Sequence, residues 1–262
     1  MTSIEPFFEN LAFTTWDAIE AAFDYRIMFG EDAITSVNLL ALKNASFSEI
    51  VIADTRVQER LKGCDFEFWI GNYSAGWTRY AIQAKKINVS SERYDSLNHT
   101  VGGRAQIDIL GIYANTNNAV PLYCLYNYSK SKIMPSTACP KFKNIKEFGC
   151  SITPLETARH ALGTRGARNF NWFHTRKETL PWSCLVRCPD LMKHWPVKVL
   201  GMEYESARHR ILPRELSEMF DSQGENNSLI DTEIFSGETE YRPRWVGVIN
   251  TETKVLNSYD LK

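Results

Sequence analysis

The sequence lacks the features that mark membrane-spanning and exported proteins. No stretch of its 262 residues approaches the ~18 uncharged apolar residues that a transmembrane helix needs. The first residues include Glu5 and Glu9, with no basic region ahead of an apolar run, so they do not resemble a signal peptide. There is also no internal repeat and no low-complexity tract. We therefore expect a globular protein without a membrane partner.

The cysteines are irregularly spaced and lack the pattern of a disulfide-rich protein. Six cysteines in 262 residues do not suggest a disulfide scaffold, so reduced thiols in a cytoplasmic protein are expected. Cys139, Cys150, Cys184 and Cys188 raise the alternative of a zinc site. Structural zinc sites usually have tighter cysteine pairs, and only Cys184 and Cys188 lie close together in the sequence. Buried reduced thiols are the favoured interpretation.

An excess of either charge is also missing. The formal net charge is −1, which gives no overall attraction to nucleic acid or to an anionic membrane. Locally, residues 159–177 combine five Lys or Arg with three aromatic residues. Arg165 and Arg168 in this stretch are either nucleic-acid contacts or part of an ordinary helix surface. Residues 203–240 carry ten acidic and three basic residues, as a solvated face or a partner-docking surface would.

Two common catalytic motifs are absent. No nucleophile-elbow motif supports serine hydrolase chemistry, and no Walker-type glycine-rich loop supports nucleotide hydrolysis. The composition is 44% hydrophobic and 23% charged, which is typical of a globular protein with a substantial core. If the protein is an enzyme, its chemistry therefore depends on other polar residues of the predicted elements.

Local periodicity predicts the elements of an α/β domain. The expected helices cover 14–28, 31–44 and 103–115, and the expected strands cover 49–55, 64–71, 77–87 and 119–128. Over residues 31–128 the order is helix, strand, strand, strand, helix, strand. This order predicts a central mixed sheet flanked by helices.

The second half of the chain has a less regular pattern. A helix is expected over 153–163, another begins at 213 before a polar loop that reaches 227, and a last strand covers 242–252. The loop over 131–150 is the best candidate for a boundary. It divides a core over 1–130 from an irregular α+β C-terminal elaboration over 131–262, which the same domain could also include.

Polar residues gather on one face of the hairpin formed by strands 64–71 and 77–87. If Gly71 lies opposite Trp77, then Asp65 lies opposite Gln83. A shift of register by one residue would destroy this coincidence. Because side chains alternate between faces, one face carries Asp65, Glu67, Gln83 and Lys85. This face is either a solvent-exposed side of the hairpin or a functional site.

Glu31 adds a carboxylate to this set. It stands on a helix between Ile27 and Ile34, on the same apolar stripe, where a carboxylate needs a partner or a metal ion. Carboxylates and an amide oxygen suit Mg²⁺ or Mn²⁺. A lysine beside such an ion can orient an attacking water and offset charge on a phosphate. The combination is typical of phosphodiester hydrolysis.

The arrangement resembles the PD-(D/E)xK restriction-endonuclease-like superfamily. The element order, Glu31, Asp65 and the sequence IQAKK containing Gln83 and Lys85 carry the resemblance, and the QxK form is similar to that of Mrr-type restriction enzymes. The resemblance implies that Asp65 and Gln83 bind the metal, that Lys85 assists the water and that Glu31 completes the metal shell. Gln replaces the more common acidic residue, and the lost charge should weaken metal binding or favour a single ion.

Four further residues have two interpretations each. Glu67 supports the site or faces solvent, and Lys86 is an edge residue or a phosphate contact. Gln106 and Tyr113 share a helix face. They resemble a Gln and a Tyr of RecB-like nucleases at a different spacing, or they are ordinary packing residues.

The expected function is that of a Mg²⁺- or Mn²⁺-dependent endonuclease. Double-stranded DNA is the expected substrate, and by analogy with similar proteins the context is bacterial defence against foreign DNA. Two alternatives remain open. The protein retains the nuclease fold as an inactive nucleic-acid-binding module, or it is a partner-binding protein with an acidic docking face. A homodimer or a complex with a partner subunit is compatible with each interpretation.

Overall fold

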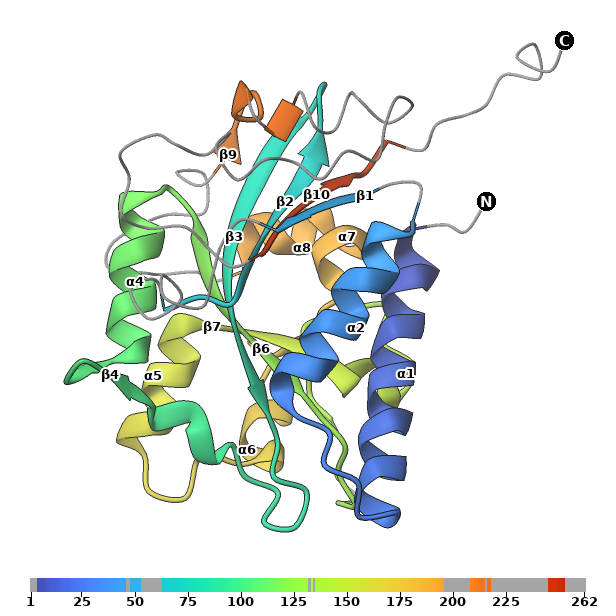
Figure 1. Ribbon diagram of the computed structural model, residues 1–262, viewed down its shortest axis with the longest axis vertical. Helices are drawn as coiled ribbons and strands as arrows, with labels where there is room; N and C mark the ends of the chain where they lie inside the picture. Colours follow the sequence, from blue (N-terminus) through green and yellow to red (C-terminus); the bar gives the residue numbers. More distant parts are fainter. Residues whose placement is uncertain are drawn as a thin grey trace, which may run out of the picture.

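The protein has a mixed β-sheet with helices packed on both faces (Figure 1). The computed structural model describes residues 4–45, 48–52, 63–131, 133, 135–195, 208–214, 216–217 and 245–252. The strands of the sheet are β1 Ser48–Ile52, β2 Phe66–Asn72, β3 Gly76–Lys86, β6 Val120–Tyr126, β7 Cys150–Pro154, β8 Leu180–Pro181, β9 Arg208–His209 and β10 Trp245–Asn250. The helices are α1 Ile4–Asp24, α2 Glu31–Lys43, α4 Gln106–Thr116, α5 Leu155–Gly163, α6 Phe170–His174, α7 Cys184–Arg187 and α8 Pro189–His194.

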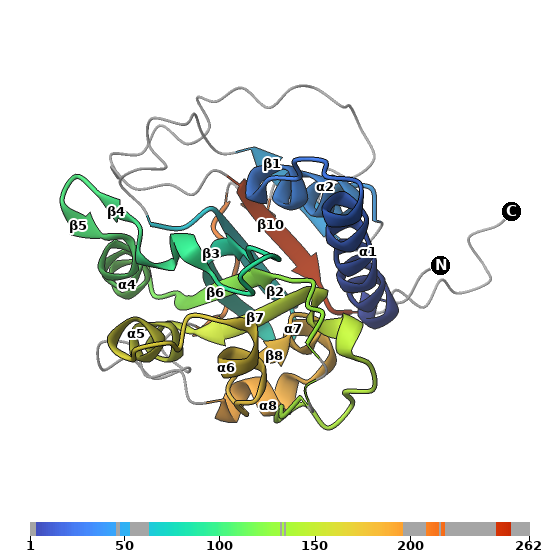
Figure 2. The same cartoon turned by 90° about the horizontal axis from the view of Figure 1, so that it is seen from below.

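The sheet has the strand order β1-β10-β2-β3-β6-β7-β8, with β9 paired to β3. Strand β10 runs parallel to β2, and β3 runs parallel to β6, whereas the other pairs are antiparallel. Figure 2 shows β10 between β1 and β2. Strands from beyond residue 130 therefore extend the same sheet on both sides of the β2–β3 hairpin.

The predicted order of elements over residues 31–128 is confirmed as α2, β1, β2, β3, α4 and β6. The predicted helix over 153–163 and the final predicted strand are also present, as α5 and β10. Residues 53–55 of the predicted first strand lie outside the described residues. The helix predicted from residue 213 is helical at Arg214, Leu216 and Ser217, and its continuation also lies outside them.

Two predicted helix starts are wrong. Helix α1 begins at Ile4 rather than at Thr14, because Phe8, Leu11 and Ala12 extend its buried stripe towards the N-terminus. It also ends at Asp24 rather than at Met28, and Ile27 is exposed rather than part of a buried stripe with Glu31. Helix α4 begins at Gln106 rather than at residue 103. The preceding residues instead form a small hairpin of β4 Thr100–Val101 and β5 Arg104–Ala105. Its turn uses positive φ angles of 57° and 80° at Gly102 and Gly103, a region that glycine adopts without steric cost.

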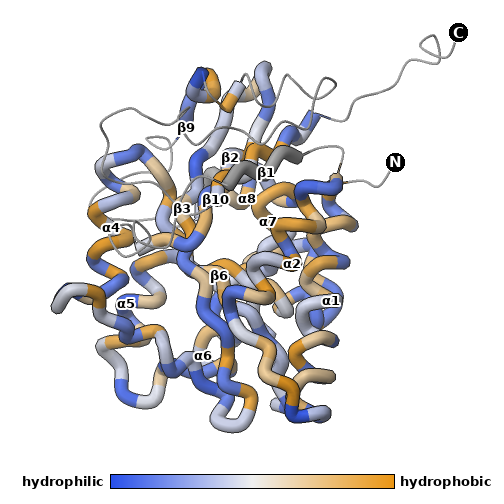
Figure 3. Tube along the Cα trace, viewed as in Figure 1, coloured by the Kyte–Doolittle hydropathy of each residue, from blue (hydrophilic) through white to orange (hydrophobic). Residues whose placement is uncertain are grey.

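Aromatic residues fill the core between the sheet and α1. The ring of Phe68 lies 6.5 Å from that of Phe8 and 5.0 Å from that of Phe66, measured between centroids. Trp182 packs on Phe8 at 5.1 Å, and its indole N–H donates to the Phe8 carbonyl. Helices α1 and α2 cover this face, whereas α4 and α5 cover the other. Hydrophobic and hydrophilic residues alternate along α1 and α4 (Figure 3), as expected for helices with one buried side.

In the part of the chain that the structure describes, no helix combines the length and the apolar composition needed to cross a bilayer.

Candidate functional site

The predicted register of the β2–β3 hairpin is confirmed. Gly71 pairs with Trp77, and Phe66 pairs with Ile82, so Asp65 lies across from Gln83 where β2 begins. The Asp65 amide donates to the Ile82 carbonyl at 2.9 Å. The hairpin thus fixes the backbone of Asp65 directly beside the polar segment of β3.

Two carboxylates accept hydrogen bonds from the edge of β3 that β2 leaves free. Strand β3 continues past the start of β2 (Figure 1). There the backbone N–H of Ala84 donates to Asp65 Oδ2 at 2.7 Å, and the N–H of Lys86 donates to Glu31 Oε2 at 2.8 Å. Amides two residues apart in a strand lie ~7 Å apart. The free edge of β3 therefore holds the two carboxylates at successive positions.

Lys85 lies between these groups in sequence and is almost fully buried. Its Nζ atom lies 3.6 Å from Glu31 Oε1, and only 5% of its side chain is exposed. Burial raises the pKa of Glu31 above its usual value, although the Lys85 ammonium and the Lys86 N–H oppose the shift. The predicted approach of Glu31 to the β3 residues is therefore present in the structure. Its carboxylate and the Lys85 ammonium compensate each other's charge.

Hydrogen bonds fix the side-chain amide of Gln83, but its oxygen has no partner among the described residues. Its Nε2 donates to Asp65 Oδ2 at 2.5 Å and to the Ala84 carbonyl at 3.1 Å. Its Oε1 is buried and has no hydrogen-bond partner among the described residues. An unpaired buried acceptor costs ~1–3 kcal/mol. A bound cation or hydrogen-bond donor that contacts Gln83 Oε1 would offset that cost.

Two more buried oxygens without partners in the described region lie on the elements around Gln83. They are the hydroxyl of Tyr123 and the Oε1 of Gln106. Tyr123 is the register partner of Gln83 on β6, so the two side chains stand next to each other on one face. Burial raises the pKa of Tyr123, and the Asp65 carboxylate raises it further. The phenol is therefore neutral at ordinary pH and can donate a hydrogen bond.

The backbone before Asp65 passes close to α4. A Cβ atom on Gly63 would lie 2.6 Å from the Leu110 amide nitrogen and 3.0 Å from the Gln106 carbonyl oxygen, and the φ angle of Gly63 is 66°. The contact leaves no room for a side chain, and the angle is one that glycine adopts without steric cost. This close approach brings the first turn of α4, with Gln106, to the chain segment that leads into Asp65.

Glu67 belongs to a second buried polar cluster on the same face. Its two carboxylate oxygens accept from Arg79 Nε and Nη2, both at 2.9 Å. The Tyr113 hydroxyl donates to Glu67 Oε1 at 2.5 Å. The solvent-facing interpretation of Glu67 is wrong, because only 1% of its surface is exposed. Tyr113 is also committed to this cluster, which braces α4 against the hairpin.

Lys86 lies at the wall of a cavity of about 620 Å³ between the α1–α2 connection and the end of β3. Glu31 lines the same cavity, so this space leads to the candidate site. Burial lowers the pKa of Lys86, and the nearby Glu31 carboxylate only partly opposes the shift. Arg26 and Asp95 also line the cavity, which gives its wall charges of both signs.

The two arginines predicted as nucleic-acid contacts lie after α5. Arg165 is exposed and Arg168 is partly buried. Within the described residues, no hydrogen bond or ion pair joins either side chain to Glu31, Asp65, Gln83 or Lys85. The structure brings those four together and leaves the two arginines outside the group.

Sequence reasoning missed Tyr123 and Arg79. A tyrosine inside a fully buried strand is indistinguishable by pattern from a core residue. Arg79 lies four residues before Gln83 on β3, and strand alternation alone would have placed it on the polar face. That signal was available and would have supplied the partner of Glu67.

Comparison with known proteins identifies the family. Residues 4–253 match the family of unknown function DUF6615, so the chain belongs to that family. No curated protein and no solved structure matches the chain.

Proposed function

We propose that this protein is a metal-dependent nuclease with a restriction-endonuclease-like core. The observation that carries the proposal is the convergence of Asp65, Glu31 and Lys85 on the end of β3, beside the unpaired oxygen of Gln83. Carboxylates, an amide oxygen and a lysine are residue types that can support metal-dependent phosphodiester hydrolysis. The combination of such groups next to a cavity supports a catalytic role over a structural one.

The donor set fits Mg²⁺ or Mn²⁺. Asp65, Gln83 and Glu31 would supply hard oxygen ligands, and the unpaired Gln83 oxygen is the group that such an ion would satisfy. When bound, the ion activates a water molecule and stabilises negative charge on the phosphate. With a neutral amide in place of a third carboxylate, the site suits one ion better than two.

Lys85 is the proposed acid–base and charge-stabilising residue. Its contact with Glu31 holds the ammonium at the edge of the site rather than free in solvent. From there it orients the attacking water and offsets the charge that develops on the phosphate. Glu31 therefore has two roles, as an oxygen ligand and as the group that positions Lys85.

The proposed substrate is double-stranded DNA, and the proposed setting is defence against foreign DNA in a bacterial cytoplasm. The cavity beside Glu31 supports an approach of the substrate from this side, since Lys86 and Arg26 line it and can contact phosphates. Cutting both strands would require two copies of the site, which makes a homodimer part of the proposal.

One observation favours an inactive nucleic-acid-binding protein as the second candidate. Asp65 already accepts hydrogen bonds from Gln83 and from the Ala84 amide, so its charge is stabilised without an ion. A site whose carboxylate is already satisfied by hydrogen bonds within the protein can be stable without a metal ion.

A cleavage assay separates the two candidates. The full-length protein is incubated with supercoiled plasmid, linear DNA, single-stranded DNA and RNA, with Mg²⁺, Mn²⁺ or EDTA. We expect metal-dependent cutting of DNA that Asp65→Asn and Lys85→Met abolish. Asp17→Asn and Lys146→Met, which break a surface ion pair, serve as matched controls and should cut normally.

Three results would count against the nuclease. They are intact substrates under every condition, cutting that survives EDTA, and equal cutting by the two site variants. Salt-dependent DNA binding without cleavage would select the second candidate.

A further inference from the structure

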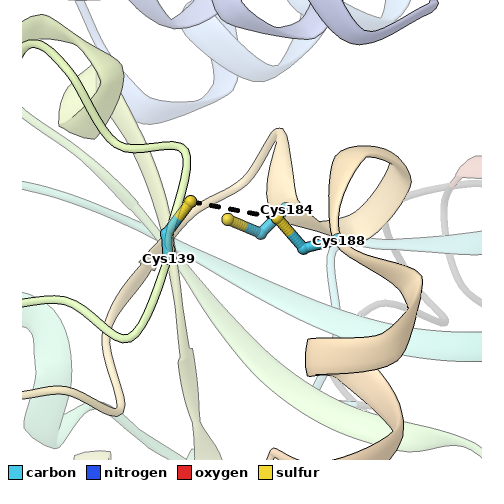
Figure 4. A group of neighbouring side chains, drawn as sticks. All are labelled: Cys139, Cys184 and Cys188. Atoms are coloured by element: carbon cyan, nitrogen blue, oxygen red, sulfur yellow. Dashed lines mark hydrogen bonds between the residues drawn. The ribbon is translucent and has the colours of Figure 1, made fainter.

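Three cysteines from two distant segments meet in the core. Cys139 lies on the connection between β6 and β7, Cys184 begins α7, and Cys188 lies between α7 and α8. All three are buried and reduced, and their Sγ atoms all lie within 4.8 Å of one another (Figure 4). No other group of three potential metal ligands lies so close together among the described residues.

The spacing of the sulfur atoms fits a tetrahedral metal better than a disulfide. The Sγ atoms of Cys139 and Cys188 are 3.9 Å apart, whereas a disulfide needs ~2.05 Å. Zinc binds thiolate sulfur at ~2.3 Å, so two sulfurs in a tetrahedral site lie ~3.8 Å apart. The observed pair has this separation already.

Hydrogen-bond donors surround the sulfur of Cys139. Arg187 Nη2 lies 3.1 Å from it, and the backbone N–H of Lys141 also donates to it. Donors that point at a sulfur atom stabilise its thiolate form, and the thiolate is the form that binds metal.

The cysteines elsewhere in the core behave differently. Cys150 hydrogen-bonds to Thr15 and Asn38 rather than to another sulfur. Cys124 belongs to no group of three potential metal ligands among the described residues. Burial alone therefore does not produce the environment of the three-cysteine cluster.

We propose that Cys139, Cys184 and Cys188 bind a structural zinc ion. Three thiolates and Zn²⁺ would carry a net charge of −1, and the Arg187 guanidinium, which also pairs with Glu9 and Glu147, would donate a hydrogen bond to the Cys139 sulfur. A water molecule would take the fourth position of a tetrahedral site. The ion would tie the β6–β7 connection to α7 and α8. Through the ion pair of Arg187 with Glu9, it would also support α1.

Metal content and cobalt spectra test the proposal, which does not depend on the nuclease activity. The full chain is produced in zinc-supplemented medium and purified under reducing conditions without chelator. We expect inductively coupled plasma mass spectrometry to find about one zinc ion per chain. Replacement with Co²⁺ should give thiolate charge-transfer bands and the intense visible bands of a tetrahedral site.

Cysteine variants supply the controls. Cys139→Ser and Cys188→Ser should lose the ion, whereas Cys150→Ser should keep it, and Asp65→Asn should keep it even where cleavage is lost. Folded wild-type protein that holds no zinc after reconstitution overturns the proposal, as does a disulfide between these cysteines or full zinc content in Cys188→Ser. If the serine variants fail to fold, the cobalt spectrum of the wild type decides, and its absence counts against the site.

Discussion

His174 should make the protein sensitive to mild acid. Its side chain is fully buried, with Nδ1 donating to the Phe170 carbonyl at 2.9 Å and Nε2 accepting from the Ser151 hydroxyl at 2.9 Å. The imidazole also stacks on the Phe170 ring at 4.1 Å. Burial lowers its pKa from 6.5 to about 3, and the bond to Phe170 only partly opposes this shift. The folded protein therefore holds this histidine neutral.

The sign and size of the effect follow from the two pKa values. Between pH 3 and pH 6.5 the unfolded chain binds a proton at His174 that the folded chain does not bind. The stabilisation is thus complete above pH 6.5 and is lost as the pH falls. The full difference corresponds to ~5 kcal/mol, of which about 2 kcal/mol is lost between pH 7 and pH 5.

Urea denaturation at several pH values tests this reasoning. The variant His174→Gln keeps a polar side chain that does not titrate, so it should be less stable at pH 7 but lose less stability on acidification. Carboxylates elsewhere affect both proteins equally, and the difference between the two curves isolates His174. Parallel curves for wild type and variant would refute the argument. The result also sets the lowest pH at which cleavage can be assayed on folded protein.

Four further predictions concern the two polar clusters. Arg79→Met should destabilise the protein by ~3–5 kcal/mol in urea denaturation, because it leaves the Glu67 carboxylate buried without its positively charged partner. The double variant Arg79→Met, Glu67→Leu should recover part of this stability, and no recovery would contradict the reasoning. Tyr123→Phe removes a buried hydroxyl that has no partner among the described residues and should raise stability by ~1 kcal/mol, so a loss of stability would show that the hydroxyl has a partner. Gln83→Glu should tighten Mg²⁺ binding in titration calorimetry by adding a negative charge, and unchanged affinity would remove Gln83 from the ligand set. As the pH is lowered, Mg²⁺ affinity should already fall above pH 4.5, the usual pKa of a glutamate, because the pKa of Glu31 is raised. The variant Glu31→Gln should flatten this dependence.

The site was predictable where local pattern determines geometry. Alternation along β2 and β3 and the turn between them fix one register, and this register alone places Asp65 beside Gln83. Both residues belong to one hairpin with a short turn. The stripe argument for Glu31 was wrong, because Ile27 lies outside α2 and is exposed. The contact of Glu31 with Lys85 and the Lys86 N–H depends instead on how α2 packs against β3.

Contacts between distant segments were not predictable in this way. The cluster of Cys139 with Cys184 and Cys188 depends on how α7 packs against the β6–β7 connection, and no sequence periodicity records that packing. Only one close cysteine pair is visible in the sequence, which therefore favours buried reduced thiols over a zinc site. Similarly, β10 is recognisable as a strand, but its neighbours β1 and β2 are chosen by long-range pairing.

The place of β10 determines when the sheet can be completed during synthesis. In the described part of the sheet, β1 pairs only with β10, so its strand pairing depends on residues 245–250. Until the ribosome has made those residues, β1 and the outer edge of β2 face a gap one strand wide. Open edges of this kind can pair with other chains, and strand pairings between distant residues form slowly. The nascent chain therefore exposes an unpaired strand edge beside Asp65 for most of its synthesis. A chain truncated after residue 130 would keep that edge unpaired.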